Sequence, residues 1–293
     1  MELNYDYPLY RPPSEANSMI FQVTLGCSFN KCSFCNMYRT KDYSERPWDE
    51  IKLEIDLSSK YYPDTKRIFL ADGDALNLST ERLVQIIEYL YKKFPNIERV
   101  SSYAMPKNLL QKSDRDLKKL KNAGLSMFYV GIESGNDVVL KKVTKGATFK
   151  TIIESCNKAM NNDYILSCMV ILGLGGTTYS KEHIIDTAKV LGEVSPNFVG
   201  ALNLQLEDGV YEEFMTKYAE PFTFLNDSQI LDELELLVSN INPKREIIFR
   251  ANHASNVYSI KGTLPQDKLK IINLIKNLRE HPEMLKPKML RRF

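Results

Sequence analysis

The sequence predicts an α/β protein built as a partial (β/α)6 TIM-like barrel with a C-terminal helical cover. Short β-branched runs alternate along the chain with longer amphipathic stretches. The expected strands are almost continuously apolar, which is typical of parallel strands with helices packed outside them. Six strand–helix units follow one another, too few for a closed barrel of eight. We therefore expect an open barrel.

The first three units have clear boundaries. Apolar runs predict strands at 18–26, 67–71 and 98–103. Helices are predicted at 47–60, from Ser79, and at 114–122. The segment from Ser79 to Arg82 resembles a helix cap and precedes an apolar face at helical spacing. Gly124 is expected to end the helix at 114–122, because glycine favours the position after a helix.

The alternation continues through three further units. Strands are expected at 127–133, 165–173 and 198–205, and helices at 136–143, 149–160 and 180–194. After the sixth strand the pattern loosens, with helices at 228–242 and 266–280 around a short apolar run at 247–250. No Gly/Pro/Ser-rich linker separates the parts. We expect a core at residues 1–206 and a covering extension at 207–293 in the same structural unit.

The composition is that of a globular protein that needs no disulfides. Of the 293 residues, 43% are hydrophobic and 26% charged. The net charge of +2 gives no signal for a nucleic-acid partner. The amino terminus lacks a secretion signal, and the most apolar run, at 165–174, is about half the length of a membrane span. We expect a cytoplasmic location, reduced thiols and no membrane association.

Three of the five cysteines, Cys27, Cys32 and Cys35, fall within nine residues directly after the first expected strand. Their C-x4-C-x2-C spacing suits metal binding better than a disulfide framework. A structural zinc site would need a fourth ligand, which the nearby sequence does not offer. A catalytic zinc with three thiolates and a redox dithiol of Cys32 and Cys35 remain alternatives. An iron–sulfur cluster with one open iron is the interpretation we favour.

This loop resembles the cluster loop of the radical S-adenosylmethionine (radical SAM) superfamily, whose usual spacing is C-x3-C-x-aromatic-C. Phe34 supplies the aromatic residue, and one additional residue separates the first two cysteines. The resemblance implies a [4Fe–4S] cluster on Cys27, Cys32 and Cys35. It also implies that S-adenosyl-L-methionine binds the open iron and is cleaved to a 5′-deoxyadenosyl radical. Phe34 and Met37 would line the adenine.

Further motifs occur at successive strand ends. ADGDAL at 71–76 resembles the superfamily's glycine-rich segment, so Gly73 and Asp74 would hold the SAM ammonium group. GIESG at 131–135 resembles the subset related to coproporphyrinogen oxidase, Elongator-type and methylthiotransferase-type enzymes. There Glu133 would bind the ribose, with Ser134 beside it. Asn203 and Gln205 alternate on the sixth strand, so we expect both to face the barrel mouth and contact SAM or substrate.

The last candidates concern the substrate. Arg250 and His253, in the polar stretch at 249–268, could converge over the barrel mouth in catalytic roles, and Tyr103 ends the third strand. The resemblance implies a small-molecule or peptide substrate and an electron donor of the flavodoxin or ferredoxin type. Cys156 and Cys168 are expected in the core. A non-catalytic iron–sulfur electron carrier or scaffold, or a zinc-dependent hydrolase or lyase, are the alternatives.

Overall fold

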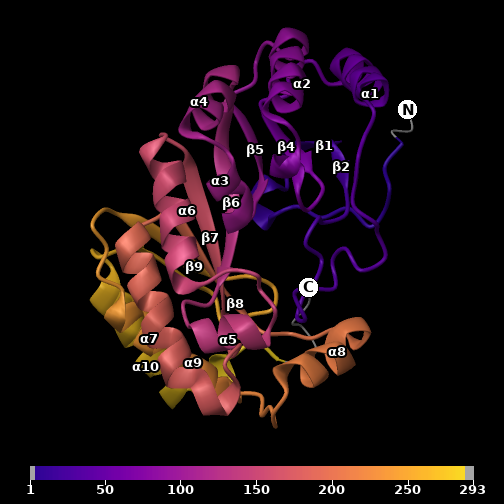
Figure 1. The fold of residues 1–293 in the computed structure, drawn as a ribbon. Coiled ribbons are helices and arrows are strands. Elements are labelled where there is room, and N and C mark those ends of the chain that lie inside the picture. Colours follow the sequence, from indigo (N-terminus) through magenta and orange to yellow (C-terminus); the bar gives the residue numbers. More distant parts are fainter. Residues whose placement is uncertain (1–3, 288–293) are drawn as a thin grey trace. The chain divides into compact units, whose positions relative to one another are not determined.

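A computed structural model describes residues 4–287 of the chain (Figure 1). The chain divides into two compact units. Unit 1 comprises residues 1–30, 36–130 and 157–166, and unit 2 comprises residues 31–35, 131–156 and 167–293. The cysteine loop therefore contributes Cys27 to unit 1, and Cys32 and Cys35 to unit 2.

Unit 1 is a parallel sheet with helices on it. Its strands run in the order β1 (Met19–Gln22), β4 (Arg67–Ala71), β5 (Arg99–Ala104) and β6 (Leu125–Glu133), whose last residues belong to unit 2. The helices are α1 (Trp48–Tyr61), α2 (Thr80–Lys93), α3 (Pro106–Gln111) and α4 (Asp114–Ala123), and α1, α2 and α4 lie side by side (Figure 1). Strands β2 (Thr24–Leu25) and β3 (Ser44–Glu45) pair antiparallel, so they close the base of the loop that carries the cysteines.

Local signals explain the helix boundaries of unit 1. The Ser79 side chain accepts a hydrogen bond from the backbone N–H of Arg82 and caps α2, as the sequence predicts. Gly124 follows α4 with a φ of 118°, a conformation that favours glycine, and this ends the helix. These two boundaries confirm the predicted ones.

Unit 2 continues the alternation. Its strands run in the order β7 (Ile165–Leu172), β8 (Phe198–Asn203), β9 (Ile247–Ala251) and β10 (Ile260–Leu264). Strands β7, β8 and β9 are parallel, and β10 is antiparallel to β9. The remaining helices are α5 (Asp137–Lys142), α6 (Phe149–Asn161), α7 (Gly176–Val194), α8 (Asp208–Tyr218), α9 (Asp227–Asn240) and α10 (Lys268–Glu280).

The strands of unit 2 have two different faces. One face carries the fully buried residues, such as Cys168, Val199 and Phe249, and Figure 1 shows α7, α9 and α10 gathered on one side of these strands. The alternate residues point to the opposite face and stay half-buried or exposed. We define this second side as the open face; its residues include Met169, Phe198, Gly200, Ile248, Arg250 and Lys261.

The predicted α/β fold class is confirmed, because parallel strands alternate with helices in both units. The C-terminal region differs in one respect. The apolar run at 247–250 is strand β9, which pairs with β8, and β10 follows it, so this region adds strands as well as helices. The first predicted strand is divided into β1 and β2, and α3 and α8 were not predicted. No helix within residues 4–287 is long and apolar enough to span a bilayer.

Candidate functional site

The start of the cysteine loop is fixed by the buried carboxylate of Asp72, directly after β4. The backbone N–H of Gly26 donates to Asp72 Oδ2 over 3.2 Å, and the Gln22 side chain donates over 2.9 Å. Lys41 Nζ lies 3.0 Å from the same oxygen. Burial raises the pKa of Asp72, and the hydrogen bond from Lys41 opposes the shift. This network holds the residue before Cys27 against the carboxyl end of a strand, where active sites lie in such folds.

None of the three loop cysteines forms a disulfide within residues 4–287, and all three are half-buried. Within unit 2, the backbone N–H of Cys35 donates to the carbonyl of Cys32, and the N–H of Ser33 donates to Val143 after α5. The second half of the loop is thus attached to α5. Thiols that are neither sealed in the core nor fully exposed are the type of donor that an iron–sulfur cluster takes. Within residues 4–287, no three His, Cys, Asp or Glu side chains are grouped closely enough to hold a metal ion, so the structure supports the type of donor and not an assembled site.

Glu133 and Lys145 form a buried ion pair beside the same half of the loop. Glu133, with a φ of 64°, ends β6, and its Oε1 lies 2.9 Å from Lys145 Nζ. The two side chains are 12% and 11% exposed. Although burial opposes it, the pKa of Lys145 is raised, chiefly by Glu133 and also by Cys32 and Cys35. The Lys145 ammonium therefore interacts electrostatically with two of the loop cysteines.

Two neighbours shape this ion pair. A Cβ atom placed on Gly131 would lie 2.0 Å from Glu133 Oε1 and 2.9 Å from Lys145 Nζ, so a larger residue there would require the paired side chains to move. Lys145 Nζ also lies 6.0 Å from the centre of the Phe34 ring. The helix that follows is capped by Asn136, which accepts from the N–H groups of Val138 and Val139. Asn136, and not Glu133, thus caps this helix, and the Glu133 carboxylate is paired with Lys145.

Gly73 and Asp74 lie after β4 in unit 1. Asp74 is fully buried and accepts a hydrogen bond from Ser28 Oγ, one residue after Cys27. Burial raises its pKa to about 6, and the hydrogen bond from Ser28 opposes the shift. A Cβ on Gly73 would lie 2.4 Å from the Tyr38 ring, so close packing against Tyr38 already requires glycine there.

Ser134 is occupied by neighbours within unit 2. Its hydroxyl lies 2.8 Å from His183 Nδ1 and accepts from the N–H of Asn136. The other ring nitrogen of His183 lies 3.0 Å from the carbonyl oxygen of Ile171. Burial lowers the pKa of His183 to about 4, so the ring is neutral. Ser134 thus ties the end of β6 to α7.

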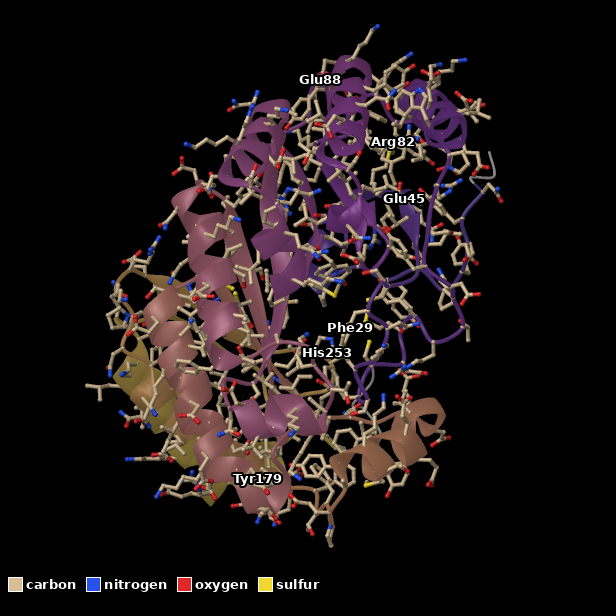
Figure 2. All side chains as sticks on the ribbon, viewed as in Figure 1. Phe29, Glu45, Arg82, Glu88, Tyr179 and His253 are labelled. Carbon is tan, nitrogen blue, oxygen red and sulfur yellow. The ribbon has the colours of Figure 1, made fainter. Side chains whose placement is uncertain are left out.

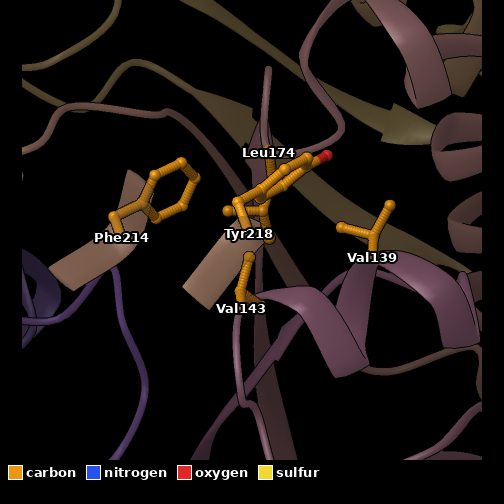
Figure 3. Close-up of a cluster of buried hydrophobic side chains, with 5 residues drawn as sticks. All are labelled: Val139, Val143, Leu174, Phe214 and Tyr218. Atoms are coloured by element: carbon orange, nitrogen blue, oxygen red, sulfur yellow. The ribbon is translucent and has the colours of Figure 1, made fainter. Parts of the chain in front are cut away.

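The glycine-rich turn after β7 is held by two later helices. Gly173, with a φ of 81°, donates its N–H to Glu233 Oε2 of α9 over 2.6 Å. Ser180 of α7 donates to the other oxygen of Glu233 over 2.8 Å. The Tyr218 hydroxyl of α8 donates to the carbonyl of Gly175 over 2.9 Å. Figure 3 shows the apolar cluster beneath the turn, which consists of Val139, Val143, Leu174, Phe214 and Tyr218.

Glu233 makes this region sensitive to pH. Burial raises its carboxyl pKa from 4.5 to about 7, so the folded protein holds the proton more tightly than the unfolded chain. Stability from this group is therefore present at low pH and is lost as the pH rises from about 4.5 to about 7. We expect it to lower the free energy of unfolding by about 3 kcal/mol over that range. Urea unfolding of Glu233→Gln should lack this decrease, whereas the exposed Glu212→Gln should keep it. Equal pH profiles for wild type and Glu233→Gln would contradict the assignment.

Asn203 and Gln205 do not share a face. Strand β8 ends at Asn203, whose Cα pairs with that of Leu172 on the helix-covered side. The Asn203 side chain is buried and accepts from the Tyr258 hydroxyl over 3.4 Å. Gln205 lies beyond the strand and donates to the carbonyl of Ser255. The strand alternation stops two residues earlier than predicted, so β8 does not include Gln205, and a role for both amides at the barrel mouth stays a prediction.

The other predicted residues occupy separate places. Arg250 lies on the open face of β9, and half-buried His253, labelled in Figure 2, follows that strand. The N–H of Ser255 donates to His253 Nδ1, so the neutral ring carries its proton on Nε2. In unit 1, Tyr103 of β5 packs edge-on against Phe69, and Met37 is half-buried in a turn. Cys156 and Cys168 are fully buried, which confirms their predicted place in the core.

Sequence reasoning missed Lys145 and Glu233. A signal existed for Lys145, because a buried glutamate after an apolar strand needs a cation, and three lysines follow within twelve residues. The turn at Thr144 and Gly146, both at positive φ, selects Lys145 among them. No local signal marks Glu233, because its partners lie about 53 and 60 residues away along the chain.

Comparisons with known proteins agree with the predicted resemblance. Residues 21–190 match the family model of the radical SAM superfamily. The heme chaperone HemW of Bacillus subtilis (strain 168) is 29% identical over 128 residues, which is 43% of this chain and 34% of that protein. The 4'-phospho-dehydrooxetanocin synthase of Priestia megaterium is 21% identical over 267 residues, 82% of this chain and 34% of that protein. The chain thus spans about a third of the length of these curated relatives.

A solved structure shows the same fold. The coproporphyrinogen III oxidase HemN from Escherichia coli, described as a radical SAM enzyme, superposes with a TM-score of 0.57 at 14% identity. The match covers 76% of this chain and 51% of that one. At this identity the similarity concerns the fold alone.

Proposed function

Because the chain belongs to the radical SAM superfamily, whose members use a [4Fe–4S] cluster and S-adenosyl-L-methionine, we propose that it cleaves this cofactor reductively. When bound, the cluster supplies the electron that breaks a carbon–sulfur bond of SAM, which gives methionine and a 5′-deoxyadenosyl radical. That radical abstracts hydrogen from a substrate. The observation that carries the proposal is the set of three half-buried cysteines after the first strand, with the Glu133–Lys145 pair in the electrostatic surroundings of Cys32 and Cys35.

The proposed roles of the residues follow from their chemistry. Cys27, Cys32 and Cys35 would hold the cluster, and SAM would bind the iron that has no cysteine ligand. Lys145 is a cation in a largely buried place, and it suits the SAM carboxylate. Glu133 accepts hydrogen bonds from the ribose hydroxyls. Its fixed ion pair with Lys145 keeps the carboxylate oriented in the absence of cofactor, since both side chains are held against Gly131.

Other assignments are proposed from the resemblance. Asp74 and the backbone at Gly73 receive the SAM ammonium group, and Phe34 and Met37 flank the adenine. Ser134 acts by fixing the backbone after Glu133, in keeping with its hydrogen bond to His183. Asn203 and Gln205 shape the site through Asn256 and Ser255, and Tyr103 contacts substrate. Residues 207–293 cover the barrel as an extension of the 1–206 core.

For the electron donor and the substrate we propose only a chemical class. A flavodoxin- or ferredoxin-type protein delivers the electron, and the substrate is a small molecule or peptide. His253 carries its ring proton on Nε2 and has a pKa lowered by burial and by Lys286. The neutral ring can therefore donate a hydrogen bond to a substrate through Nε2.

The test is production of 5′-deoxyadenosine. The protein is reconstituted anaerobically with iron and sulfide, reduced with dithionite and mixed with SAM. We expect 5′-deoxyadenosine above a no-enzyme control from the wild type, and none above that control from Cys35→Ala. A fully loaded, reducible cluster that neither yields 5′-deoxyadenosine nor binds SAM would refute the proposal.

A further inference from the structure

Two cations lie side by side on the open face of unit 2. Arg250 of β9 pairs in register with Lys261 of β10, and on its other side it pairs with Gly200 of β8. Gly200 in turn pairs with Met169 of β7. Residues paired in register point to the same side of a sheet, so Arg250 and Lys261 face away from the covering helices.

This pair is not neutralised within the part of the chain that the structure describes. Both side chains are exposed, and no carboxylate of residues 4–287 lies within 4.0 Å of either one. The Arg250 guanidinium donates only to backbone carbonyls, at Phe249 over 2.8 Å and at Gly262 over 3.4 Å. Like charges directly opposite each other destabilise a strand pair, so an anion placed between them would relieve a repulsion built into the sheet.

An apolar surface adjoins the cations. Phe198 and Ile248 pair in register next to them and are half-buried on the same face. A Cβ atom on Gly200 would meet no heavy atom nearer than 3.8 Å, so the position beside Arg250 is open. A ligand can therefore lie flat over Gly200, with its apolar part on Phe198 and Ile248 and a charged end at Arg250.

One further cation, Lys286, lies near the segment that follows β9. His253 lies two residues beyond the end of β9, and its pKa is lowered by burial and by the charge of Lys286. Lys286 itself donates to the carbonyl of Ala254 in the same segment. The two cations of the open face, Arg250 and Lys261, thus favour an anion over a cation or a neutral molecule.

We propose that Arg250 and Lys261 bind the anionic group, a carboxylate or a phosphate, of a substrate whose apolar part lies on Phe198 and Ile248 across Gly200. The inference rests on the proposed function, since it names the substrate class for that reaction. Arg250 is then a substrate-binding residue and not a proton donor, because a guanidinium stays charged throughout the physiological pH range.

Three probes test the site: octanoate, octyl phosphate and octanol. They have the same apolar chain and differ only in the head group, and each is used below its critical micelle concentration. Anaerobic calorimetry of the reconstituted protein should show at least one of the two anions binding about tenfold more tightly than octanol. In Arg250→Gln and in Lys261→Gln the affinity for that anion should fall about tenfold, while octanol binding stays the same. The stronger anion distinguishes a carboxylate from a phosphate.

Lys270→Gln is the matched control, because Lys270 is exposed on α10, the helix packed against the opposite face, and loses the same charge. It should bind all three probes as the wild type does. Equal anion affinity in wild type, Arg250→Gln and Lys261→Gln, or equal binding of octanol and both anions, would overturn the inference. The wild-type preparation is assayed in parallel for 5′-deoxyadenosine. Its absence beside charge-dependent anion binding would refute the proposed function and leave the anion site standing.

Discussion

Replacing Cys32 by alanine is expected to abolish iron loading and SAM cleavage together. An alanine side chain cannot ligate iron, and two thiolates do not retain a [4Fe–4S] cluster that also needs an open iron for SAM. After anaerobic reconstitution, we expect about four irons per wild-type chain and close to none in Cys32→Ala. Formation of 5′-deoxyadenosine should fall to the no-enzyme background.

The matched control is Cys156→Ala, which removes a thiol that is fully buried beside Cys168, outside the cysteine loop. Its iron content and colour should equal those of the wild type, although removing buried atoms lowers its stability by about 1 kcal/mol. Iron is measured by a colorimetric assay and by the visible absorbance of the cluster. Full iron content in Cys32→Ala would contradict the ligand assignment, and iron loss in Cys156→Ala would show that the loop cysteines are not the whole site.

The sequence predicts those parts of the fold that rest on neighbouring residues. Ser79 and Gly124 were assigned correctly because a cap and a helix end depend on contacts within four residues. The segment Asp208–Tyr218 was missed as a helix because its stability comes from packing Phe214 and Tyr218 into the cluster of Figure 3. Strand β10 was missed for a similar reason. Its pairing with β9 defines which of its residues lie on each face, and the sequence of β10 alone does not show this.

In the candidate site, too, residues in a local motif were predictable and residues placed by strand pairing were not. The spacing of Cys27, Cys32 and Cys35 carries its own chemistry, so the sequence alone identifies the kind of metal centre. The pairing of Arg250 with Lys261 depends on strand register, and no sequence pattern here states which residues stand opposite each other. The face on which Asn203 lies depends on where β8 ends, which a periodic pattern locates only to within a few residues.

The Glu133–Lys145 pair leads to the other large expected effect. In Lys145→Met the Glu133 carboxylate stays buried without its cation, so the free energy of unfolding should fall by about 3–5 kcal/mol. Adding Glu133→Gln removes the uncompensated charge. The double variant should therefore recover most of the lost stability, because replacing both partners of a buried ion pair is often nearly neutral. Denaturant unfolding of both variants and of the wild type measures this difference.

The affinity for SAM shows whether the Glu133–Lys145 pair binds the cofactor or only stabilises the fold. If Lys145 holds the SAM carboxylate and Glu133 the ribose, the double variant stays stable and still binds SAM at least about tenfold more weakly than the wild type. Lys141→Met, an exposed lysine of the preceding helix, should match the wild type in stability and in SAM affinity. Anaerobic equilibrium dialysis with the reconstituted proteins gives the affinities. Wild-type SAM affinity in the stable double variant would limit the pair to holding β6 and the turn after α5 together.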